Sequence, residues 1–507
     1  MGVLGQSKHI NMMMLLTVLF FFFFTAIAWR RLDWAMMIIV FALPSYLIRF
    51  NIMGLPFTLL EGMILIAFTV WFLKSWPTVF LGLRAKIRGM KELGRENYPF
   101  GLEIILLLIV AFIAAGVAGF SRESLGIFKA YFFEPALFFI LLFNTLGREA
   151  LEDIKSRWPE KILWPLAISG LAVSLLAVYQ KFTGNLIDNP LWQAEGTRRV
   201  VSFFGYPNAV GLYLGPLILL FTGWLAKEFS EVKQGSNRIF NFHFSIFNSK
   251  IFKIFFIAFV IAISLLAIYF AKSRGAIIGV AAGIFVFGLL AGKKVRLITL
   301  GLGLILAAGI YFYPPAKEIA AEKIALRDLS GEIRKQQWRE TWAMLSDGRL
   351  ISGAGLSGYQ AAVAPYHQEG IFFNKLKNPD FHRKTVFDAA YRKLVWQPVE
   401  IYMYPHNIFL NFWSELGLAG MLLFIFIIGK YFVVVILNLK RKSDGLKYKY
   451  LNIGLIGAMA VIVVHGLVDV PYFKNDLSVM FWIFIFMVSL INLKHKSALS
   501  GAGQENV

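Results

Sequence analysis

One histidine stands where a long polar segment meets a strongly apolar one. It is His406, in the run 404–410 (YPHNIFL), which closes a polar stretch and opens an apolar one. An imidazole is the side chain best suited to move a proton near pH 7. A structural histidine with satisfied ring nitrogens would fit the same place, so His406 is a candidate general base rather than an assigned one.

Three further polar groups beside apolar runs contain arginine. Arg274 lies in a short turn between two apolar runs, Arg198 and Arg199 precede another run, and Arg339 lies in the polar stretch before His406. Guanidinium groups stay charged and offer planar, bidentate donors, which suits a diphosphate. The competing explanation for Arg274 is that its side chain reaches into lipid headgroups. The functional hypothesis for these arginines is therefore that they bind an anion.

Several kinds of chemistry are not indicated. The seven histidines form no cluster with carboxylates at metal-ligand spacing, so we predict no metal and no cofactor. The chain has no cysteine, which excludes disulfides and thiol catalysis. Gly353, Gly355 and Gly358 have the spacing of a dinucleotide fingerprint, but no strand precedes them, so we interpret them as a tight turn. No Asp-x-Asp pair occurs in a basic loop, which disfavours a sugar-nucleotide glycosyltransferase.

The elements that must position these residues are membrane helices. The chain has 507 residues, 58% of them hydrophobic and 16% charged, with a mean hydropathy of +0.65; soluble domains carry about 25% charged residues. Its apolar runs are near the ~20 residues that cross a bilayer, unlike the short alternating segments of an outer-membrane barrel. We predict an all-α polytopic membrane protein. Thirteen candidate spans lie near 10–28, 34–50, 56–74, 101–120, 127–146, 162–182, 208–226, 252–271, 275–291, 295–313, 407–438, 450–468 and 476–493.

The charge pattern orients these spans. The formal net charge is +21, and most basic residues sit in short loops, as the positive-inside rule predicts, so we expect membrane lipids and no nucleic acid as partners. Alternation puts five basic loops on the cytoplasmic side: 74–95, 148–161, 227–253, 293–296 and 440–442. The arginine groups and His406 then share the opposite side. With thirteen spans the N-terminus would lie outside; with twelve, because one of the first two runs does not cross, it would lie inside.

The segment 314–405 is the one long loop on that opposite side. We predict an amphipathic helix over 332–345, with Gly348 as its stop, and a second helix over 387–396. The apolar positions of the first helix would be Ile333, Trp338, Trp342 and Leu345. The 494–507 tail is polar, and we expect it to be disordered.

Taken together, these motifs resemble those of the O-antigen ligase and O-antigen polymerase superfamily. The matching elements are Arg199 with Phe204-Gly205-Tyr206-Pro207-Asn208, then Ser273-Arg274-Gly275-Ala276, then Arg339-x-x-Trp342 with Gly353-x-Gly355, and finally His406-Asn407-x-x-Leu410 with Glu415-x-Gly417-x-x-Gly420. Each motif is short, but their order, spacing and common membrane side make the combination specific. A proline usual before the Gly-x-Gly turn is absent, and Leu350 stands near that place.

The resemblance implies a glycosyltransferase of the bacterial inner membrane, with its active site on the periplasmic or extracellular face. Its donor would be a polyprenyl-pyrophosphate-linked glycan, and its acceptor a hydroxyl on a lipid, a glycan or a protein. The reaction would need no metal and would invert the anomeric centre. His406 would be the general base. Arg199 and Arg274 would hold the pyrophosphate, and Arg198, Arg339 and Asn407 would be further substrate-binding residues.

We accordingly divide the chain into four parts. These are an N-terminal transmembrane bundle (1–250), a ligase- or polymerase-like core that includes the 314–405 loop (251–440), C-terminal transmembrane helices (441–493) and the polar tail (494–507). A ligase is the leading hypothesis and a repeat-unit polymerase the second. A flippase for a lipid-linked glycan is the alternative from another class. Few spans carry the mid-helix charge that a transport path would need, the exceptions being Glu61, Glu103, Lys129 and Glu134.

Overall fold

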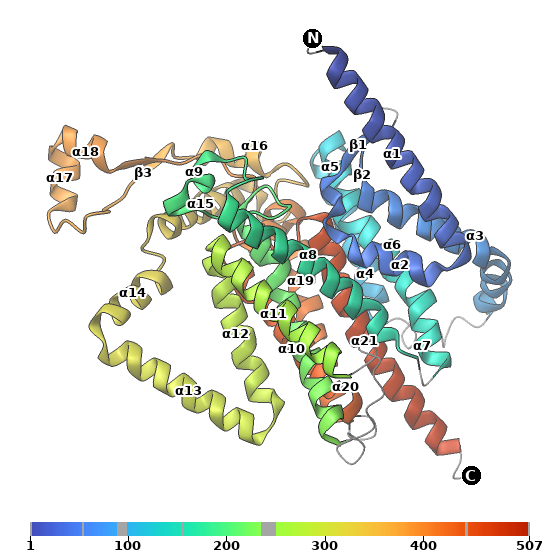
Figure 1. The fold of residues 1–507 in the computed structure, drawn as a ribbon. Helices are drawn as coiled ribbons and strands as arrows, with labels where there is room; N and C mark the ends of the chain where they lie inside the picture. Colours follow the sequence, from blue (N-terminus) through green and yellow to red (C-terminus); the bar gives the residue numbers. More distant parts are fainter. Residues whose placement is uncertain are drawn as a thin grey trace.

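The computed structural model describes residues 3–52, 55–88, 99–153, 156–234, 250–441 and 445–504. The described chain is almost entirely helical (Figure 1), and the expected all-α polytopic fold is confirmed. The longer helices are α1 (Val3–Arg30), α2 (Leu32–Phe41), α3 (Leu59–Arg88), α4 (Gly101–Val117), α8 (Trp158–Thr183), α10 (Pro207–Gln234), α11 (Lys250–Ala271), α12 (Arg274–Ala291), α13 (Lys293–Phe312), α14 (Pro314–Ile324), α15 (Leu329–Met344), α19 (Ile408–Lys440), α20 (Gly445–Gly466) and α21 (Asn475–Gln504).

Short elements complete the chain. One further span is continuous but changes helix type along its length: α5 (Arg122–Phe128), η2 (Lys129–Phe133), α6 (Glu134–Leu142), η3 (Phe143–Gly147) and α7 (Arg148–Glu152). The others are η1 (Leu43–Leu47), α9 (Pro190–Gln193), η4 (Glu195–Thr197), η7 (Leu345–Arg349), α16 (Tyr359–Val363), η8 (Ala364–Tyr366), α17 (Phe381–Phe387) and α18 (Ala389–Val395). Two antiparallel strand pairs occur outside the spans: β1 (Arg49–Ile52) with β2 (Leu55–Thr58), and β3 (Gly370–Phe372) with β4 (Trp396–Pro398).

The thirteen apolar runs all fall on helices. Ten helices in the described chain are long and apolar enough to cross a membrane, and three apolar helices, Leu15–Arg30, Leu32–Phe41 and Gly101–Val117, are shorter. The ten residues of α2 span about 15 Å, half of a bilayer core of about 30 Å. One of the first two runs is therefore too short to cross by itself, as the sequence allowed.

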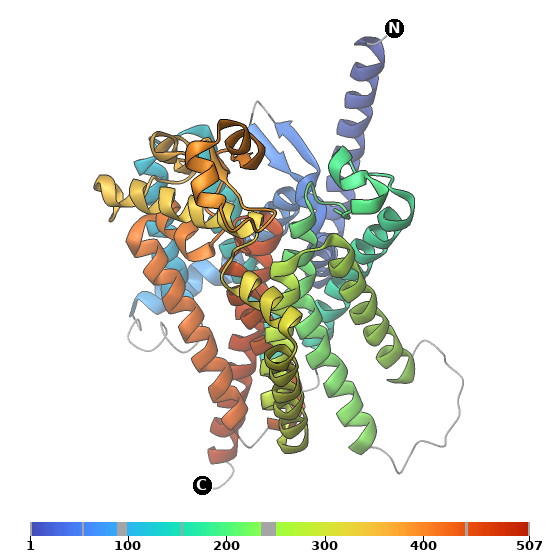
Figure 2. The same ribbon diagram turned by 90° about the vertical axis from the view of Figure 1, so that its left-hand side faces the viewer.

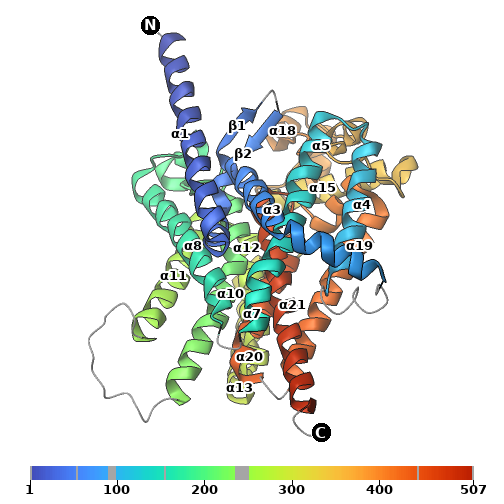
Figure 3. The ribbon, with the colours of Figure 1, turned by 90° about the vertical axis from the view of Figure 1, so that its right-hand side faces the viewer.

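The two ends of the bundle differ. The start of α1 and the end of α21 lie at opposite ends, as Figures 1, 2 and 3 agree. The expectation that a non-crossing early run would leave both ends of the chain on one side was therefore wrong. The turn between α12 and α13 lies at the end where α21 finishes, and α9, α15, α16 and β1–β2 lie at the other (Figures 1 and 3). The basic turn at 293–296 and the 314–405 segment thus occupy opposite ends, in line with the charge pattern.

Glycines bring three spans into close contact at the centre. A Cβ on Gly223 of α10 would lie 2.5 Å from the Tyr450 carbonyl oxygen of α20, and one on Gly283 of α12 would lie 2.9 Å from Val461 of α20. Small residues let membrane helices approach closely and gain van der Waals contact. These three helices carry or flank most of the polar residues described below. Their tight packing therefore holds those residues in fixed positions.

Two pairs of opposite charges inside the bundle join different helices. Lys129 contacts Glu61 at 3.1 Å, and Lys430 contacts Glu103 at 2.6 Å. Pairing is the usual condition for keeping charge within a membrane. These pairs join α3 to η2 and α4 to α19, so they hold the N-terminal helices to the rest of the bundle.

The long loop differs in detail from the prediction. The expected first helix is α15, and its helical geometry breaks at Asp347 and Gly348, close to the predicted stop. The predicted apolar face was only partly right. Leu345 is buried, but Trp342 is 51% exposed, and the buried positions include Gln336, Gln337, Glu340 and Thr341. These polar side chains are hydrogen-bonded to one another and to the loop, so α15 docks through a polar network.

The rest of the loop is also broken into shorter elements than expected. The second predicted helix, 387–396, corresponds to α18, and another short helix, α17, precedes it. Asp388 caps α18 by accepting a bond from the Tyr391 backbone amide at 2.9 Å. Trp396, the last residue of that predicted helix, belongs to β4 instead. Pairing of β3 with β4 closes the α17–α18 hairpin at its base (Figure 1).

The Gly-x-Gly turn is the joint between loop and bundle. Gly353 and Gly355 have positive φ angles of 68° and 82°, which favour glycine. A Cβ at Gly353 would lie 2.6 Å from the Trp413 carbonyl of α19, where Gly417 (φ 74°) interrupts the helix. Glu415 accepts a hydrogen bond from the Ser357 amide at 2.6 Å. The Glu-x-Gly part of the motif after His406 therefore anchors the loop.

The prediction of a disordered tail was wrong for most of its length. Helix α21 continues to Gln504, and Lys494 donates to the Ala150 carbonyl at 2.5 Å. His495 is buried. Residues 505–507 lie outside the described chain. The tail is polar, but it follows a membrane helix and contains good helix formers, so the helix runs on beyond its apolar part.

Candidate functional site

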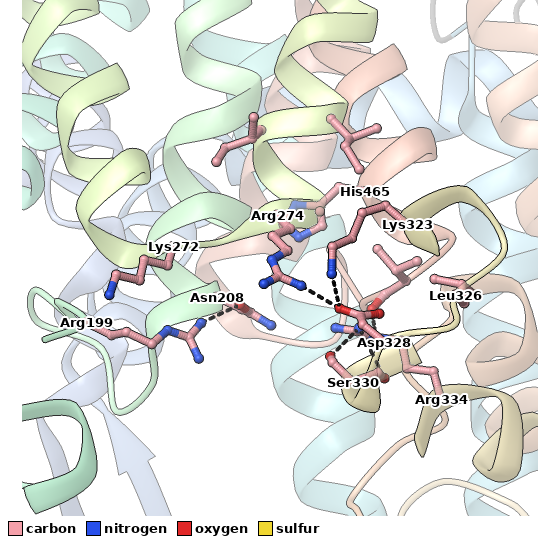
Figure 4. Close-up of a pocket in the computed structure, with 14 residues that line it drawn as sticks. Arg199, Asn208, Lys272, Arg274, Lys323, Leu326, Asp328, Ser330, Arg334 and His465 are labelled. Atoms are coloured by element: carbon pink, nitrogen blue, oxygen red, sulfur yellow. Dashed lines mark hydrogen bonds and ion pairs between the residues drawn. The ribbon is translucent and has the colours of Figure 1, made fainter. Parts of the chain in front are cut away.

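Cationic side chains converge on one cavity of about 580 Å³ at the loop end of the bundle (Figure 4). It lies among the start of α12, the α14–α15 turn, the loop before α10 and the end of α20. Five cationic side chains and one carboxylate line it: Arg199, Lys272, Arg274, Lys323, Arg334 and Asp328. We call it the cationic cavity. An excess of fixed positive charge in a partly enclosed space is the requirement for binding a multiply charged anion.

Arg274 occupies the first turn of α12 and projects into this cavity (Figure 4). Its small neighbours are there for packing: a Cβ on Gly275 would lie 2.6 Å from the His465 ring, and Gly211 of α10 leaves room for Ala276. The Arg274 guanidinium donates to Asp328, which also accepts from Lys323 at 2.8 Å. Burial would raise the pKa of Asp328, but hydrogen bonding to Lys323 and the charges of Lys323 and Arg274 lower it overall.

Arg199 enters the cavity from the opposite side (Figure 4). Its Nε donates to the Ala271 carbonyl at 3.1 Å, and its Nη2 donates to Asn208 Oδ1 at 3.4 Å. Asn208, in turn, donates to Asp469 at 3.0 Å. Burial and the charges of Arg274 and Arg334 lower the pKa of Arg199. The three guanidinium groups therefore repel one another, and an anion between them would relieve that repulsion.

Gln180 fixes the backbone that carries Arg199. This buried amide accepts from the Val201 and Ser202 amides at 2.9 and 2.7 Å, and it donates to the Ser202 carbonyl at 3.0 Å. Sequence reasoning missed Gln180, because a lone glutamine near the end of an apolar run gives no sign of what it faces.

Arg334 is the arginine that the sequence analysis overlooked. Its Nε donates to the Val468 carbonyl at 3.0 Å, and its Nη1 donates to Ser330 Oγ at 2.7 Å. Ser330, Arg334 and Gln337 stand at i, i+4 and i+7, which places them on one face of α15. That spacing was a signal available in the sequence. The Arg339-x-x-Trp342 motif favoured Arg339 instead, which lies on the other face of α15 and does not line this cavity.

His406 lines a smaller cavity of about 200 Å³ that shares Ser330 and Arg334 with the cationic cavity. Its φ of 46° is an unusual backbone conformation for a residue with a side chain, and such residues cluster at functional sites. The rings of Tyr402 and Tyr404 lie 5.1 and 5.0 Å from the imidazole.

The imidazole is held in one orientation. Its Nδ1 lies 3.1 Å from Gln337 Oε1, so Nδ1 carries the proton and Nε2 is left as the acceptor. Burial lowers the pKa of His406, and the charge of Arg334 lowers it further. The charge of Asp469 raises it, but the pKa stays below its usual value. The ring is therefore neutral near pH 7 and able to take a proton.

The other predicted binding residues lie elsewhere. Arg198 donates to the backbone carbonyls of Gln193 and Lys181, each at 2.9 Å, and lines neither cavity. Asn407 caps α19, accepting from the Phe409 and Leu410 amides at 3.0 and 3.1 Å. Arg339 lines a different cavity, on the other face of α15. Of the predicted set, the structure thus brings Arg199 and Arg274 into one cavity and His406 into its neighbour.

The comparisons with known proteins agree with this arrangement. Residues 259–425 match the model of a family described as O-antigen ligase. The matched segment contains Arg274, Arg334 and His406, together with the joint between loop and bundle. No curated protein matches the chain. Residues 259–425 thus match the O-antigen ligase family, and this match supports the resemblance of the chain to the O-antigen ligase superfamily.

Proposed function

We propose that the protein is a glycosyltransferase of the O-antigen ligase type. It would move a glycan from a polyprenyl-pyrophosphate donor to an acceptor hydroxyl. One observation carries the proposal: Arg199, Arg274 and Arg334 line one cavity, and Arg334 also lines the cavity of His406. Anion-binding groups and a neutral proton acceptor thus lie side by side, as transfer from a pyrophosphate requires. The family match supports the coarser class, a ligase- or polymerase-type glycosyltransferase.

The proposed reaction is a single displacement. The acceptor oxygen attacks the anomeric carbon, the bond from that carbon to the pyrophosphate oxygen breaks, and His406 Nε2 takes the acceptor's proton. The released polyprenyl pyrophosphate carries the electron pair of the broken bond. Attack opposite the leaving group inverts the anomeric centre. General-base assistance of this kind is typically worth ~10²–10⁴ in rate.

The arginines stabilise the leaving group. Negative charge grows on the pyrophosphate as its bond to the sugar breaks, and fixed guanidinium groups in a partly dry cavity interact more strongly with that charge than water would. In this proposal the arginines do the work that a divalent cation does in other transferases, so the reaction needs no metal. Among the described residues, no three His, Asp or Glu side chains lie close enough to hold one.

The position of the cavities fits a lipid-borne donor. Ile277 and Ile278 of α12 line the cationic cavity and are 45% and 56% exposed on a membrane helix. A polyprenyl chain held beside them would lie in the bilayer with its pyrophosphate among the arginines. We propose that this end of the bundle faces the periplasm or cell exterior and that the protein resides in the bacterial inner membrane.

His406→Ala tests the role of the base. Purified protein in lipid vesicles should lose at least about a hundredfold in transfer rate while binding the polyprenyl-pyrophosphate donor with unchanged affinity. Arg274→Ala should weaken donor binding. Arg198→Ala, whose guanidinium donates to backbone carbonyls of α8 and α9, is the matched control. If His406→Ala transfers glycan at the wild-type rate, His406 is not the general base. If Arg274→Ala binds the donor with unchanged affinity, Arg274 does not hold the pyrophosphate.

The product separates ligase from polymerase. A ligase attaches the glycan once to a lipid or protein acceptor, whereas a polymerase produces a ladder of repeat lengths on the carrier lipid. Electrophoresis of the glycans made by the purified protein from the donor, with and without an added acceptor, distinguishes the two.

A further inference from the structure

A third cavity, of about 650 Å³, lies in the long loop on the other face of α15. Its walls are α15, the β3–β4 pair and α17. Glu332, Gln336 and Arg339 stand at i, i+4 and i+7, and at 100° per residue this stripe lies opposite the stripe of Ser330, Arg334 and Gln337. We call it the loop cavity. Neither of the cavities described above includes any of its residues.

Aromatic rings form one side of the loop cavity. Phe372 and Trp396 pair edge to face at 5.0 Å and remain 41% and 39% exposed. Gly370 makes this possible, since a Cβ there would lie 2.4 Å from the Trp396 ring. Phe381 of α17 adds a third ring. All three rings belong to the loop and line one cavity, so they can contact a ligand held there.

Polar groups face the rings. Gln336 is held by Glu340, to which its Nε2 donates at 3.0 Å, and the Gln368 amide donates to the same carboxylate at 2.9 Å. Glu340 also lies 3.3 Å from His367. Arg339 has no ion-pair or hydrogen-bond partner within the described chain. The wall is therefore preorganised, and the guanidinium is free to donate to a ligand.

This combination suits a carbohydrate. Ring faces can cover the C–H side of a sugar, while amides, a carboxylate and a guanidinium can pair with its hydroxyls. The cavity is not an anion site, because Glu332 and Glu369 line it together with Arg339 and His382. The polar side of the cavity disfavours a lipid tail.

We propose that the loop cavity binds a distal segment of the donor's glycan, and this proposal rests on the proposed transfer function. The pyrophosphate fixes the first sugar at the cationic cavity, so the rest of the glycan must extend toward the loop. Ser330 and Glu332, two residues apart at the start of α15, line the two cavities. A helix is about 10–12 Å across, so a chain of a few sugars passing this end of α15 joins the two sites. The loop cavity then selects donors by glycan length and composition.

Binding of a free glycan tests the subsite without relying on catalysis. The probe is the oligosaccharide released by mild acid from the host's lipid-linked glycan, titrated into the purified full-length protein and followed by calorimetry. Trp396→Ala and Arg339→Ala should each weaken binding about tenfold, and Trp396→Phe, which keeps a ring, should retain most of it. The matched controls are Phe387→Ala and Arg383→Ala, exposed residues of α17 that do not line the cavity. His406→Ala should bind normally.

A kinetic comparison completes the test. With the full-length donor, Trp396→Ala should raise KM about tenfold at unchanged kcat. With a donor truncated to one sugar, it should behave as wild type. Equal losses with both donors would show a structural defect and overturn the subsite, as would unchanged glycan binding in Trp396→Ala or no binding by the wild type.

Two further outcomes are distinguishable. Competition by short-chain phosphatidylglycerol, without binding of oligosaccharide, would make the occupant a lipid headgroup and overturn the proposal. Oligosaccharide binding that depends on Trp396, in a protein that transfers nothing from any lipid pyrophosphate, would support the subsite and reject the transfer function.

Discussion

The two faces of α15 both present arginine and glutamine side chains, but they line cavities of different character. On one face, Arg334 joins Arg199 and Arg274 around a cavity with five cations and one carboxylate. On the other, Arg339 faces aromatic rings, amides and carboxylates, with charge nearly balanced. The two arginines are five positions apart on one helix. In the proposed function, the surroundings of each arginine, above all the number of like charges nearby, determine what it binds.

The sharpest way to break this comparison is to remove each arginine in turn. Arg334→Ala should lower kcat by ~10²–10³, because a donor to the developing charge is lost. Arg339→Ala should leave transfer from a single-sugar donor within about twofold of wild type. Steady-state kinetics with that donor measures both. Equal losses would mean that the two faces do not have separate functions.

Substitution of Gln337 tests how the face of α15 nearest His406 orients the imidazole. Gln337→Ala removes the acceptor for His406 Nδ1–H, and the ring should then sample other orientations and tautomers. We expect about a tenfold fall in kcat with little change in KM. Gln336→Ala, one position away but facing the loop cavity, is the matched control and should keep the wild-type kcat with a single-sugar donor.

The pH profile tests the electrostatics of the cationic face. His406 must be neutral to act as a base, so kcat/KM should fall as pH drops through its pKa. Burial and Arg334 lower that pKa below its usual value of 6.5, despite Asp469. The inflection should therefore lie below pH 6.5. Asp469→Asn removes the charge that raises the pKa, so the inflection should move to still lower pH; a shift upward would contradict the assignment.

The smallest effect is expected at Asn407, which we assign a positioning role through the α19 cap. Asn407→Ala should lower stability by about 1 kcal/mol and, by loosening the turn that carries His406, reduce kcat a few-fold. Asn407→Asp retains the capping oxygen and should restore most of the stability in thermal unfolding. A loss of donor binding in Asn407→Ala, with stability unchanged, would instead indicate direct contact with substrate.

The sequence predicted the spans well because lipid imposes one simple requirement, a long apolar helix. It predicted α15 as a helix but not the side that is buried. Gln336 bonds to Glu340 within the helix, but Gln337 and Glu340 also bond to partners far away in sequence, which no local pattern shows. For the same reason Arg334 was overlooked. Its i, i+4, i+7 spacing with Ser330 and Gln337 shows only a shared helix face. Its contact with Val468 and the cavity formed by four separate segments arise from tertiary packing, which the spacing does not encode.

Asp328 is an anion built into the cationic cavity. Its carboxylate already occupies Arg274 and Lys323, and its other oxygen caps α15 through the Gly331 amide at 3.2 Å. An incoming phosphate must compete with a tethered ligand that is always present. Monovalent anions of the surrounding medium compete poorly, whereas a diphosphate brings more charge. The same carboxylate therefore connects ligand exchange to the first turn of α15, the helix that lies between the cationic cavity and the loop cavity.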